Sequence, residues 1–285
     1  MSNSSVAPFV KWAGGKRQLI PQIKERMPEK YNDYYEPFVG GGAVTFELLP
    51  ANALINDINK ALINAYRQIC NAPEAFLKAV KKLDEEMWED GKEYYYSLRE
   101  HYNDKLMKAE FDVELAALFV FINKHCFNGL YRVNSKGYFN VPFGKYTNPT
   151  ICDEELLLED SKILQNVEIL CGDYTLIERY VDNNTFIYFD PPYRPLSTTS
   201  SFTSYSKENF DDTEQTRLAH FFARLSRYGC KMMLSNSDCC AQNPNDTFFE
   251  NLYGNFIIDK VHASRFVNAI PSKRGKLTEI LVRNY

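Results

Sequence analysis

The sequence predicts an α/β fold in which a mostly parallel sheet is interrupted by a helical insertion. Short apolar runs rich in β-branched and aromatic residues stop abruptly at acids or glycines, which is typical of buried parallel strands, and residues 185–189 are the clearest example. In contrast, residues 59–122 repeat apolar positions at helical spacing without strand-like alternation. A chain of 285 residues can form one large domain or two smaller ones.

The charge is unevenly distributed along the chain. The net charge of −4 argues against a general nucleic-acid binder, but residues 115–152 contain no acid at all. The first 24 residues and the tail 272–283 are also predominantly basic, whereas acids concentrate in 74–114 and 153–160. If the three basic stretches meet in the fold, they form one positive face on an acidic body.

Cysteines and hydropathy indicate the environment of the protein. The seven cysteines lack the paired spacing of a zinc site, so we expect reduced and mostly buried thiols and assign no metal site. No apolar run approaches the length of a membrane span, and the N-terminus lacks a signal-peptide pattern. We therefore expect a soluble, cytoplasmic protein without membrane association.

The candidate chemistry is concentrated in residues 185–193, TFIYFDPPY. Pro191 and Pro192 fix φ and cannot donate to a sheet, so the chain must leave the strand in a rigid turn. Ligands of open α/β sheets bind beyond the carboxyl ends of the strands, where Asp190 and Tyr193 fall. Asp190 and the Pro191 carbonyl are suited to accept both N–H bonds of an exocyclic aromatic amine while Tyr193 stacks on its ring. The alternative is an ordinary turn after an edge strand.

The N-terminal segment, residues 9–20, reads FVKWAGGKRQLI. Its two glycines allow close approach of backbone to a ligand, and the apolar spacing after them predicts a helix through Ile23. A helix N-terminus with Lys16 beside it suits a carboxylate or phosphate. A basic lead-in to a surface helix is an equally good interpretation.

A glycine turn follows in residues 34–49, YYEPFVGGGAVTFELL, which predicts a strand, a turn at residues 40–42 and a helix. A second strand is expected at 53–55 and ends at Asn56 and Asp57. An acid at this distance beyond a glycine turn suits a ribose diol, so we interpret the pair as a nucleoside pocket. The full G-x-G-x-x-G fingerprint is missing, and a structural strand end remains the alternative.

The helical insertion ends in residues 123–149, NKHCFNGLYRVNSKGYFNVPFGKYTNP, with hairpin-like Asn-Gly and Lys-Gly pairs. Asparagine can read adenine edges, arginine can read guanine, and lysine or tyrosine can hold phosphates. The stretch lacks acids and lies between the two parts of the predicted sheet. We interpret it as a DNA-reading segment, although a solvated loop can have a similar composition.

The remaining residues complete the sheet. Residues 167–170 are expected to form a strand ending at Gly172 and Asp173, 210–227 a helix, 231–234 a strand, and 256–259 with 278–283 an antiparallel pair. Residues 198–205, TTSSFTSY, are predicted to be a lid or pocket wall, and the basic residues 272–276 a turn. None of the four histidines is assigned a catalytic role.

As a set, these motifs resemble the bacterial DNA adenine methyltransferase (Dam) family, including adenine-N6 methyltransferases of GATC restriction-modification systems. The motifs are FVKWAGGK, EPFVGGG, Asn56-Asp57, FNGLYRVN, FNVPFGKY, FDPPY and FTSY, in the family's order. The resemblance implies a Rossmann-like S-adenosylmethionine-dependent methyltransferase sheet with an inserted, mainly helical target-recognition domain. Residues 1–60 and 153–285 would then form the catalytic domain, and 61–152 the recognition domain.

The resemblance also implies individual roles. It places Trp12 and Lys16 at the methionine end of S-adenosylmethionine, and Phe38, Gly40 and Gly42 along the pocket of this cofactor. Asp57 would bind the ribose and Asp173 the adenine. The catalytic residues would be Asp190, Pro191, Pro192 and Tyr193, with Asp190 also in contact with the cofactor. It assigns double-stranded DNA to Lys11, Asn128, Arg132, Lys145 and Tyr146. Some relatives have arginine at the position of Lys145, and lysine there reduces a bidentate contact to a point charge.

We therefore expect an enzyme that flips adenine from the duplex and methylates its N6 directly, with GATC as the site. A cytosine-N4 methyltransferase is the nearest alternative, because the same acceptors suit any exocyclic base amine. A catalytically silent DNA-binding regulator is a second alternative, and a nicotinamide dehydrogenase is disfavoured by the incomplete glycine fingerprint. We expect a bacterial or phage-encoded monomer, compatible with a cognate restriction endonuclease that acts independently.

Overall fold

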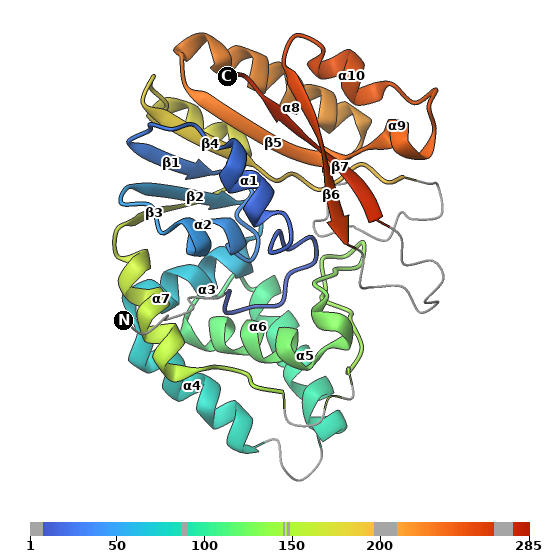
Figure 1. Ribbon diagram of the computed structural model, residues 1–285. Helices are drawn as coiled ribbons and strands as arrows, with labels where there is room; N and C mark the ends of the chain where they lie inside the picture. The colour runs from blue at the N-terminus through green and yellow to red at the C-terminus, as the bar shows by residue number, and fades with distance from the viewer. Residues whose placement is uncertain (1–7, 87–90, 145, 147–148, 197–209, 265–275) are drawn as a thin grey trace.

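The computed structural model describes residues 8–86, 91–144, 146, 149–196, 210–264 and 276–285. Within them, a seven-stranded sheet has the order β3-β2-β1-β4-β5-β7-β6 (Figure 1). The strands are β1 (Asp33–Glu36), β2 (Ala53–Asp57), β3 (Val167–Cys171), β4 (Thr185–Phe189), β5 (Lys231–Ser237), β6 (Ile257–Ser264) and β7 (Lys276–Arg283). The five strands β3, β2, β1, β4 and β5 pair in parallel. Strand β7 runs antiparallel to both of its neighbours, β5 and β6.

The helices are α1 (Ile20–Arg26), α2 (Ala43–Leu48), α3 (Lys60–Asn71), α4 (Pro73–Glu85), α5 (Gly91–Met107), α6 (Val113–His125), α7 (Glu154–Leu164), α8 (Asp212–Leu225), α9 (Cys239–Gln242) and α10 (Phe248–Tyr253). In the described ranges, the short 3-10 helices are η2 (Phe127–Gly129), η3 (Tyr174–Tyr180) and η5 (Ser226–Tyr228). This mixed α/β architecture, with its mostly parallel sheet, is consistent with the predicted Rossmann-like methyltransferase fold.

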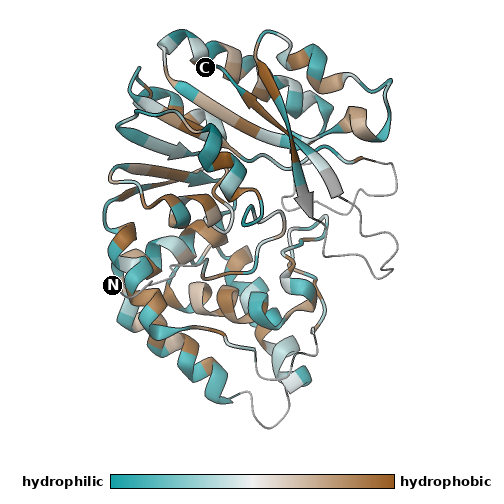
Figure 2. Cartoon of the chain, viewed as in Figure 1, coloured by the Kyte–Doolittle hydropathy of each residue, from teal (hydrophilic) through white to brown (hydrophobic). Residues whose placement is uncertain are grey.

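The central strand β4 is buried on both faces, as its apolar sequence predicts. Successive side chains of a strand point to opposite faces; Ile187 and Phe189 pack with residues of α8 and α10, whereas Phe186 and Tyr188 pack with residues of α1 and α2. All five residues of β4 are buried, and Figure 2 shows hydrophobic stretches in strands β2 and β5 of the same sheet. β4 is therefore an interior strand, and the edge-strand alternative is wrong.

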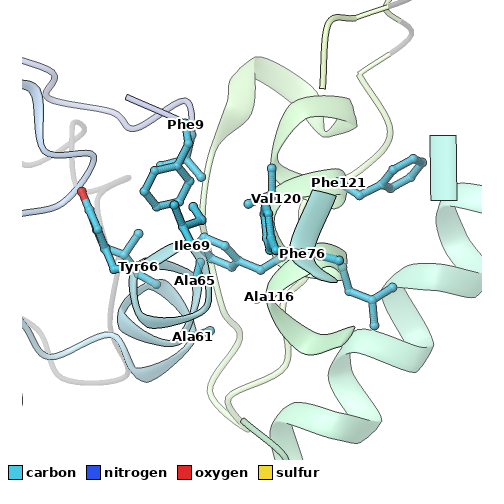
Figure 3. Packing of buried hydrophobic residues seen from close by; sticks show 14 of the residues in the cluster. Phe9, Ala61, Ala65, Tyr66, Ile69, Phe76, Ala116, Val120 and Phe121 are labelled. Atoms are coloured by element: carbon cyan, nitrogen blue, oxygen red, sulfur yellow. The ribbon is translucent and has the colours of Figure 1, made fainter. Parts of the chain in front are cut away.

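The helices α3 to α6 lie beside one edge of the sheet and share a continuous core with it (Figures 1 and 3). Ile69 of α3, Phe76 of α4 and Val120 of α6 are buried in the same cluster as Ile55 of β2. Phe9, from the N-terminal segment, joins this cluster and packs edge-on against Tyr66, with 4.8 Å between ring centroids. The insertion is thus anchored to the sheet by apolar contacts.

Several boundaries differ from the sequence-based expectation. The continuous periodicity of 59–82 is divided into two helices at Pro73, because proline lacks the N–H that an interior helical position requires and suits the first turn instead. The first helix begins at Ile20, several residues beyond the glycine pair. Helix α7 was not predicted, although Asp153 caps it by accepting a hydrogen bond from the Leu156 N–H.

The segment 123–146 forms an irregular hairpin. Isolated bridges join Cys126 to Phe143 and Val133 to Phe139, and the predicted Lys136-Gly137 turn is present, with Gly137 at φ 88°. Asn128 and Gly129 instead belong to η2, with φ 56° and 60°. The hairpin expectation at that pair is wrong, because the pair is part of a 3-10 turn. Glycine is needed at residue 129 because a Cβ there would lie 2.4 Å from Lys11 Cβ.

In the described part of the chain, no helix combines the length and apolar character needed to cross a membrane. All seven cysteines are free, and four of them are buried.

Candidate active site

The candidate site lies where the connections of the sheet change direction. Chain order runs outward from β1 through β2 to β3 on one side, and from β4 to β5 on the other, so β1 and β4 are parallel neighbours at a topological switch point. Such a point is the usual ligand position of an open α/β sheet. A cavity of about 1390 Å³ opens there, and its walls include Glu36 from the end of β1 and Asp190 from the end of β4.

Asp190 is held by two donors on one of its oxygens. Its Oδ1 lies 2.7 Å from the Lys16 Nζ and accepts a hydrogen bond from the Ser235 hydroxyl at 3.0 Å. Its Oδ2 has no hydrogen-bond partner among the described residues. Burial raises the pKa of Asp190, and the adjacent Lys16 ammonium and the Ser235 hydrogen bond oppose that shift. The result is a fixed carboxylate with one oxygen available to the cavity.

Tyr193 follows the two prolines and turns back over the site. Its hydroxyl donates to Glu279 Oε2 of β7 at 2.6 Å, which fixes the ring. The Lys16 Nζ lies 4.4 Å from the ring centroid, so the ammonium lies between Asp190 and the aromatic face. Lys16 is 6% exposed, and the structure pairs it with the candidate catalytic carboxylate rather than with the N-terminus of a helix.

Glu36 is a site residue that the sequence analysis missed. It is only 2% exposed, and its Oε2 accepts from the Tyr34 hydroxyl at 3.0 Å, from the Thr45 N–H at 3.1 Å and from the Thr45 hydroxyl. Burial raises its pKa to about 8, although the Thr45 and Tyr34 hydrogen bonds act in the opposite direction and the nearby Asp190 adds a smaller increase. The available signal was its place before the glycine turn, in EPFVGGG.

Asp57 ends β2 beside the glycine turn and faces the same cavity. Its Oδ2 accepts from the Gly40 N–H at 3.1 Å and its Oδ1 from the Asn59 N–H at 2.9 Å. Burial raises the pKa of Asp57, while these backbone hydrogen bonds lower it. Each carboxylate oxygen has two lone pairs, so Asp57 can still accept two hydrogen bonds from a diol.

The glycine turn packs more tightly against protein than the sequence suggested. Gly40 has φ 48°, and a Cβ there would lie 2.8 Å from the Trp12 ring. Trp12 itself stacks on Tyr131, with ring centroids 5.8 Å apart. Gly42 has φ 74° and precedes α2; a Cβ would lie 2.6 Å from the Tyr66 hydroxyl. Gly40 and Trp12 line the cavity, whereas Gly42 is not among the lining residues.

An aromatic slot lined by the tilted rings of Phe38, Tyr174 and Phe210 forms one end of the cavity. The Phe38 ring lies 5.2 Å from that of Tyr174 and 5.7 Å from that of Phe210, and all three residues line the cavity. Asp173 lies at the same end and is paired with Arg217 at 2.6 Å. Burial raises the pKa of Asp173, but hydrogen bonds from Arg217 and Thr175 outweigh it and hold the pKa below its usual value.

Two of the five predicted DNA contacts border the cavity, namely Lys11 and Asn128. The Lys11 Nζ lies 4.2 Å from the centroid of the Tyr146 ring, and the Tyr146 hydroxyl accepts from the Asn128 N–H at 2.9 Å. The first two basic stretches therefore meet beside the cavity.

Arg132 lies apart from the cavity lining, on the hairpin. Its Nε donates to Asn140 Oδ1 at 2.7 Å, which fixes the guanidinium. Lys145, residues 198–205 and residues 272–275 lie outside the described part of the chain. The predictions made for them stay predictions.

Together, the cavity offers the carboxylates of Asp57 and Asp173, an aromatic slot, and the carboxylate of Asp190 close to Tyr193. Small-molecule pockets typically measure roughly 300–1,000 Å³, so the cavity has room for a nucleoside cofactor and a base. The family model for D12 class N6 adenine-specific DNA methyltransferases matches residues 12–266. The chain belongs to this family.

Three relatives of this D12 methyltransferase match nearly the whole of its length. The Type II methyltransferase M.MjaIII of Methanocaldococcus jannaschii is 46% identical over 98% of this chain and 99% of its own. The Type II methyltransferase M1.LlaDCHI of Lactococcus lactis is also 46% identical, over 99% of this chain and 96% of its own. A DNA adenine methylase of Vibrio cholerae is 33% identical over 96% of this chain and 94% of its own.

Family membership establishes the chemistry. The protein is an N6 adenine-specific DNA methyltransferase, so the family favours adenine N6 over the cytosine-N4 alternative. Its substrate is DNA, and the family implies S-adenosylmethionine as the methyl donor. The acceptors, the aromatic slot and the volume of the cavity fit that cofactor.

Glu36→Gln is expected to remove a pH-dependent loss of stability. The pKa of Glu36 is raised from 4.5 to about 8, so the folded protein keeps this proton after the unfolded chain has released it. The stability contribution is therefore complete below pH 4.5 and falls as the pH rises toward 8, by roughly 1.4 kcal/mol per unit. Glutamine keeps an oxygen acceptor but does not titrate.

The measurement is urea unfolding of both proteins at several pH values across this window. The free energy of unfolding of the variant should rise relative to that of the wild type as the pH increases. A difference that stays constant with pH would contradict the assignment.

Proposed function

We propose that the protein methylates adenine N6 within GATC in double-stranded DNA, after flipping the base out of the duplex and by direct in-line transfer. The single observation that carries this proposal is the arrangement of Asp190, whose Oδ1 is occupied and whose Oδ2 is available beside Pro191 and Tyr193. The choice of GATC is supported by the resemblance of FNGLYRVN and FNVPFGKY to the segments of the Dam family.

The proposed mechanism depends on positioning. Asp190 Oδ2 and the Pro191 carbonyl accept the two N6–H bonds of the flipped adenine, and this localises the nitrogen lone pair for attack. Bound S-adenosylmethionine would supply an electrophilic methyl group on a sulfonium: as the N6–C bond forms, the S–C bond would break and the sulfur would leave as a neutral thioether. The methylated N6 would then lose one proton to Asp190 or to solvent. Extracting the base costs a few kcal/mol of unstacking, which Tyr193 offsets in part by stacking on it. Pro192 keeps the loop rigid.

Lys16 gives the site a fixed charge. Its ammonium favours the ionised, hydrogen-bond-accepting form of Asp190, and thereby opposes the rise in the pKa of Asp190 that burial causes. An ionised Asp190 is the better acceptor for an amine. Preorganised electrostatics of this kind contribute strongly to catalysis.

The cofactor roles follow the walls of the cavity. We assign the methionine end to Trp12 and Lys16 and the ribose to Asp57. Phe38 and Asp173 would hold the adenine, with Gly40 forming the wall between the two ends and Gly42 supporting the turn from behind.

We assign target recognition to residues 61–152. This assignment is supported by the way α5 holds the hairpin: the Asn103 side chain exchanges hydrogen bonds with the Phe139 backbone, and the Tyr95 hydroxyl donates to the Val141 carbonyl. Lys11, Asn128, Arg132, Lys145 and Tyr146 are the proposed DNA contacts. Arg132 keeps three of its five N–H groups for a base, two on Nη1 and one on Nη2, because Asn140 accepts only from its Nε and from one N–H of its Nη2.

A role beside a restriction endonuclease is supported by two relatives, each 46% identical to this chain, that are named Type II methyltransferases. We propose that the protein acts as a monomer and independently of such an endonuclease, because each strand of a palindrome can be methylated in a separate event.

The deciding experiment is transfer of labelled methyl from S-adenosylmethionine to two duplexes that differ only in one GATC site, followed by nucleoside analysis. We expect N6-methyladenine in the GATC duplex alone. Equal label in both duplexes would keep the activity and reject the proposed site.

Asp190→Ala is expected to abolish methyl transfer, because it removes the acceptor that localises the N6 lone pair. Binding of S-adenosylhomocysteine and of a GATC duplex should stay measurable by titration, which serves as the folding control. Asp190→Asn tests the charge, since the amide is nearly isosteric. Turnover of Asp190→Ala near the wild-type value would reject the assigned role.

Arg132→Ala is expected to reduce discrimination at one base pair of the site by about 1–3 kcal/mol, since a bidentate base contact is lost. The measurement is kcat/KM on duplexes substituted at each position in turn. Lys136→Ala, at the exposed hairpin turn, is the matched control. It should lower kcat/KM by the same factor for every duplex, or leave it unchanged. A uniform loss in Arg132→Ala would make Arg132 a phosphate contact instead.

A further inference from the structure

Arg217 of α8 lies at the adenine end of the cavity, where it binds Asp173 through two hydrogen bonds. Its Nη2 donates to Asp173 Oδ2 at 2.6 Å and its Nη1 to Oδ1 at 3.3 Å. The guanidinium also covers the Tyr174 ring, 4.4 Å from the centroid. All three residues line the cavity. No motif in the sequence pointed to Arg217.

The guanidinium is itself fixed from the opposite side. Glu214, one helical turn before it, accepts from its Nε at 3.0 Å and from its Nη2 at 2.8 Å. A planar fork held on two edges and stacked on an aromatic ring retains little freedom. Arg217 can therefore impose an orientation on Asp173.

The hydrogen bonds at Asp173 are divided unequally between its two oxygens. Oδ1 accepts from the Thr175 N–H at 3.0 Å, from the Thr175 hydroxyl at 2.6 Å and from Arg217. Among the described residues, Oδ2 accepts from Arg217 alone. Since a carboxylate oxygen offers two lone pairs, Oδ2 keeps one acceptor position.

We propose that Arg217 is a positioning residue for the cofactor, which orients Asp173 so that its free Oδ2 lone pair accepts a hydrogen bond from the exocyclic amine of the adenine. This inference rests on the proposed role of Asp173. A nucleoside with a carbonyl in place of that amine would present an acceptor to an acceptor. Arg217 therefore contributes to selecting adenosine over inosine in the cofactor.

The same helix contains a matched comparison for this ion pair. Arg224 makes two hydrogen bonds with Glu178 of η3, at 2.9 and 2.8 Å, and its guanidinium lies over the Phe221 ring. Both arginines are well exposed, Arg217 at 42% and Arg224 at 52%, and ion pairs so exposed contribute little to folding stability. Arg224 and Glu178 do not line the cavity.

The experiment is calorimetric titration of the full chain with S-adenosylhomocysteine and with S-inosylhomocysteine. Arg217→Gln should weaken S-adenosylhomocysteine binding on the order of tenfold and reduce the preference over the inosine compound. Arg217→Lys should restore part of the affinity, and Arg224→Gln should bind like the wild type. In steady-state assays, the KM for cofactor should rise in Arg217→Gln while the KM for DNA stays unchanged.

The outcomes separate this inference from the proposed function. If Arg217→Gln binds like Arg224→Gln while Asp173→Asn loses affinity, Asp173 keeps its role and the inference for Arg217 is overturned. If Asp173→Asn also binds normally, the proposed adenine contact fails and the inference falls with it. If Arg217→Gln and Arg224→Gln lower the affinity for S-adenosylhomocysteine equally, the loss is a general effect of changing α8. That outcome also overturns the inference for Arg217.

Discussion

The site depends on the parallel pairing of β1 with β4, because that pairing brings a buried and a partly buried carboxyl group together at one edge of the sheet. Glu36 ends β1 and Asp190 follows β4. Two adjacent buried carboxylates are costly to ionise together. The structure gives each a different environment: Glu36 receives neutral donors from Tyr34 and Thr45, whereas Asp190 receives the Lys16 ammonium.

This division has a chemical consequence for an amine methyltransferase. The side chain that contacts the N6 amine must accept hydrogen bonds. Asp190, which lies beside the Lys16 ammonium, is therefore better suited to that contact than Glu36. Glu36, with its pKa raised to about 8, can remain neutral beside it at lower pH. Lys16 comes from the N-terminal segment, which thereby becomes part of the cavity wall.

The helical layer serves the site by supporting the hairpin. Asn103 and Tyr95 of α5 bind backbone groups of residues 139 and 141, and the core formed with the sheet keeps that layer in place (Figure 3). Since α5 binds backbone groups of the hairpin, the hairpin side chains are not needed to attach it to the helices and can make other contacts. Lys11 joins the same surface through Tyr146.

Local sequence determined the strands, the glycine turn and the motif DPPY, because apolar runs, glycines with positive φ and prolines restrict the backbone by themselves. It also identified Asp57, Asp173 and Asp190 as acids that follow strands. Their meeting at one cavity is a property of the parallel strand order, which residue spacing alone does not fix.

Only the tertiary structure decided which partners these acids have. Lys16 and Asp190 are far apart in sequence, as are Asp173 and Arg217, and no local pattern pairs them. Glu36 appeared to be an ordinary residue before a glycine turn until its burial was known. Secondary structure follows from short-range preferences, whereas the ionisation and orientation of a side chain depend on groups that only the fold brings within hydrogen-bonding distance.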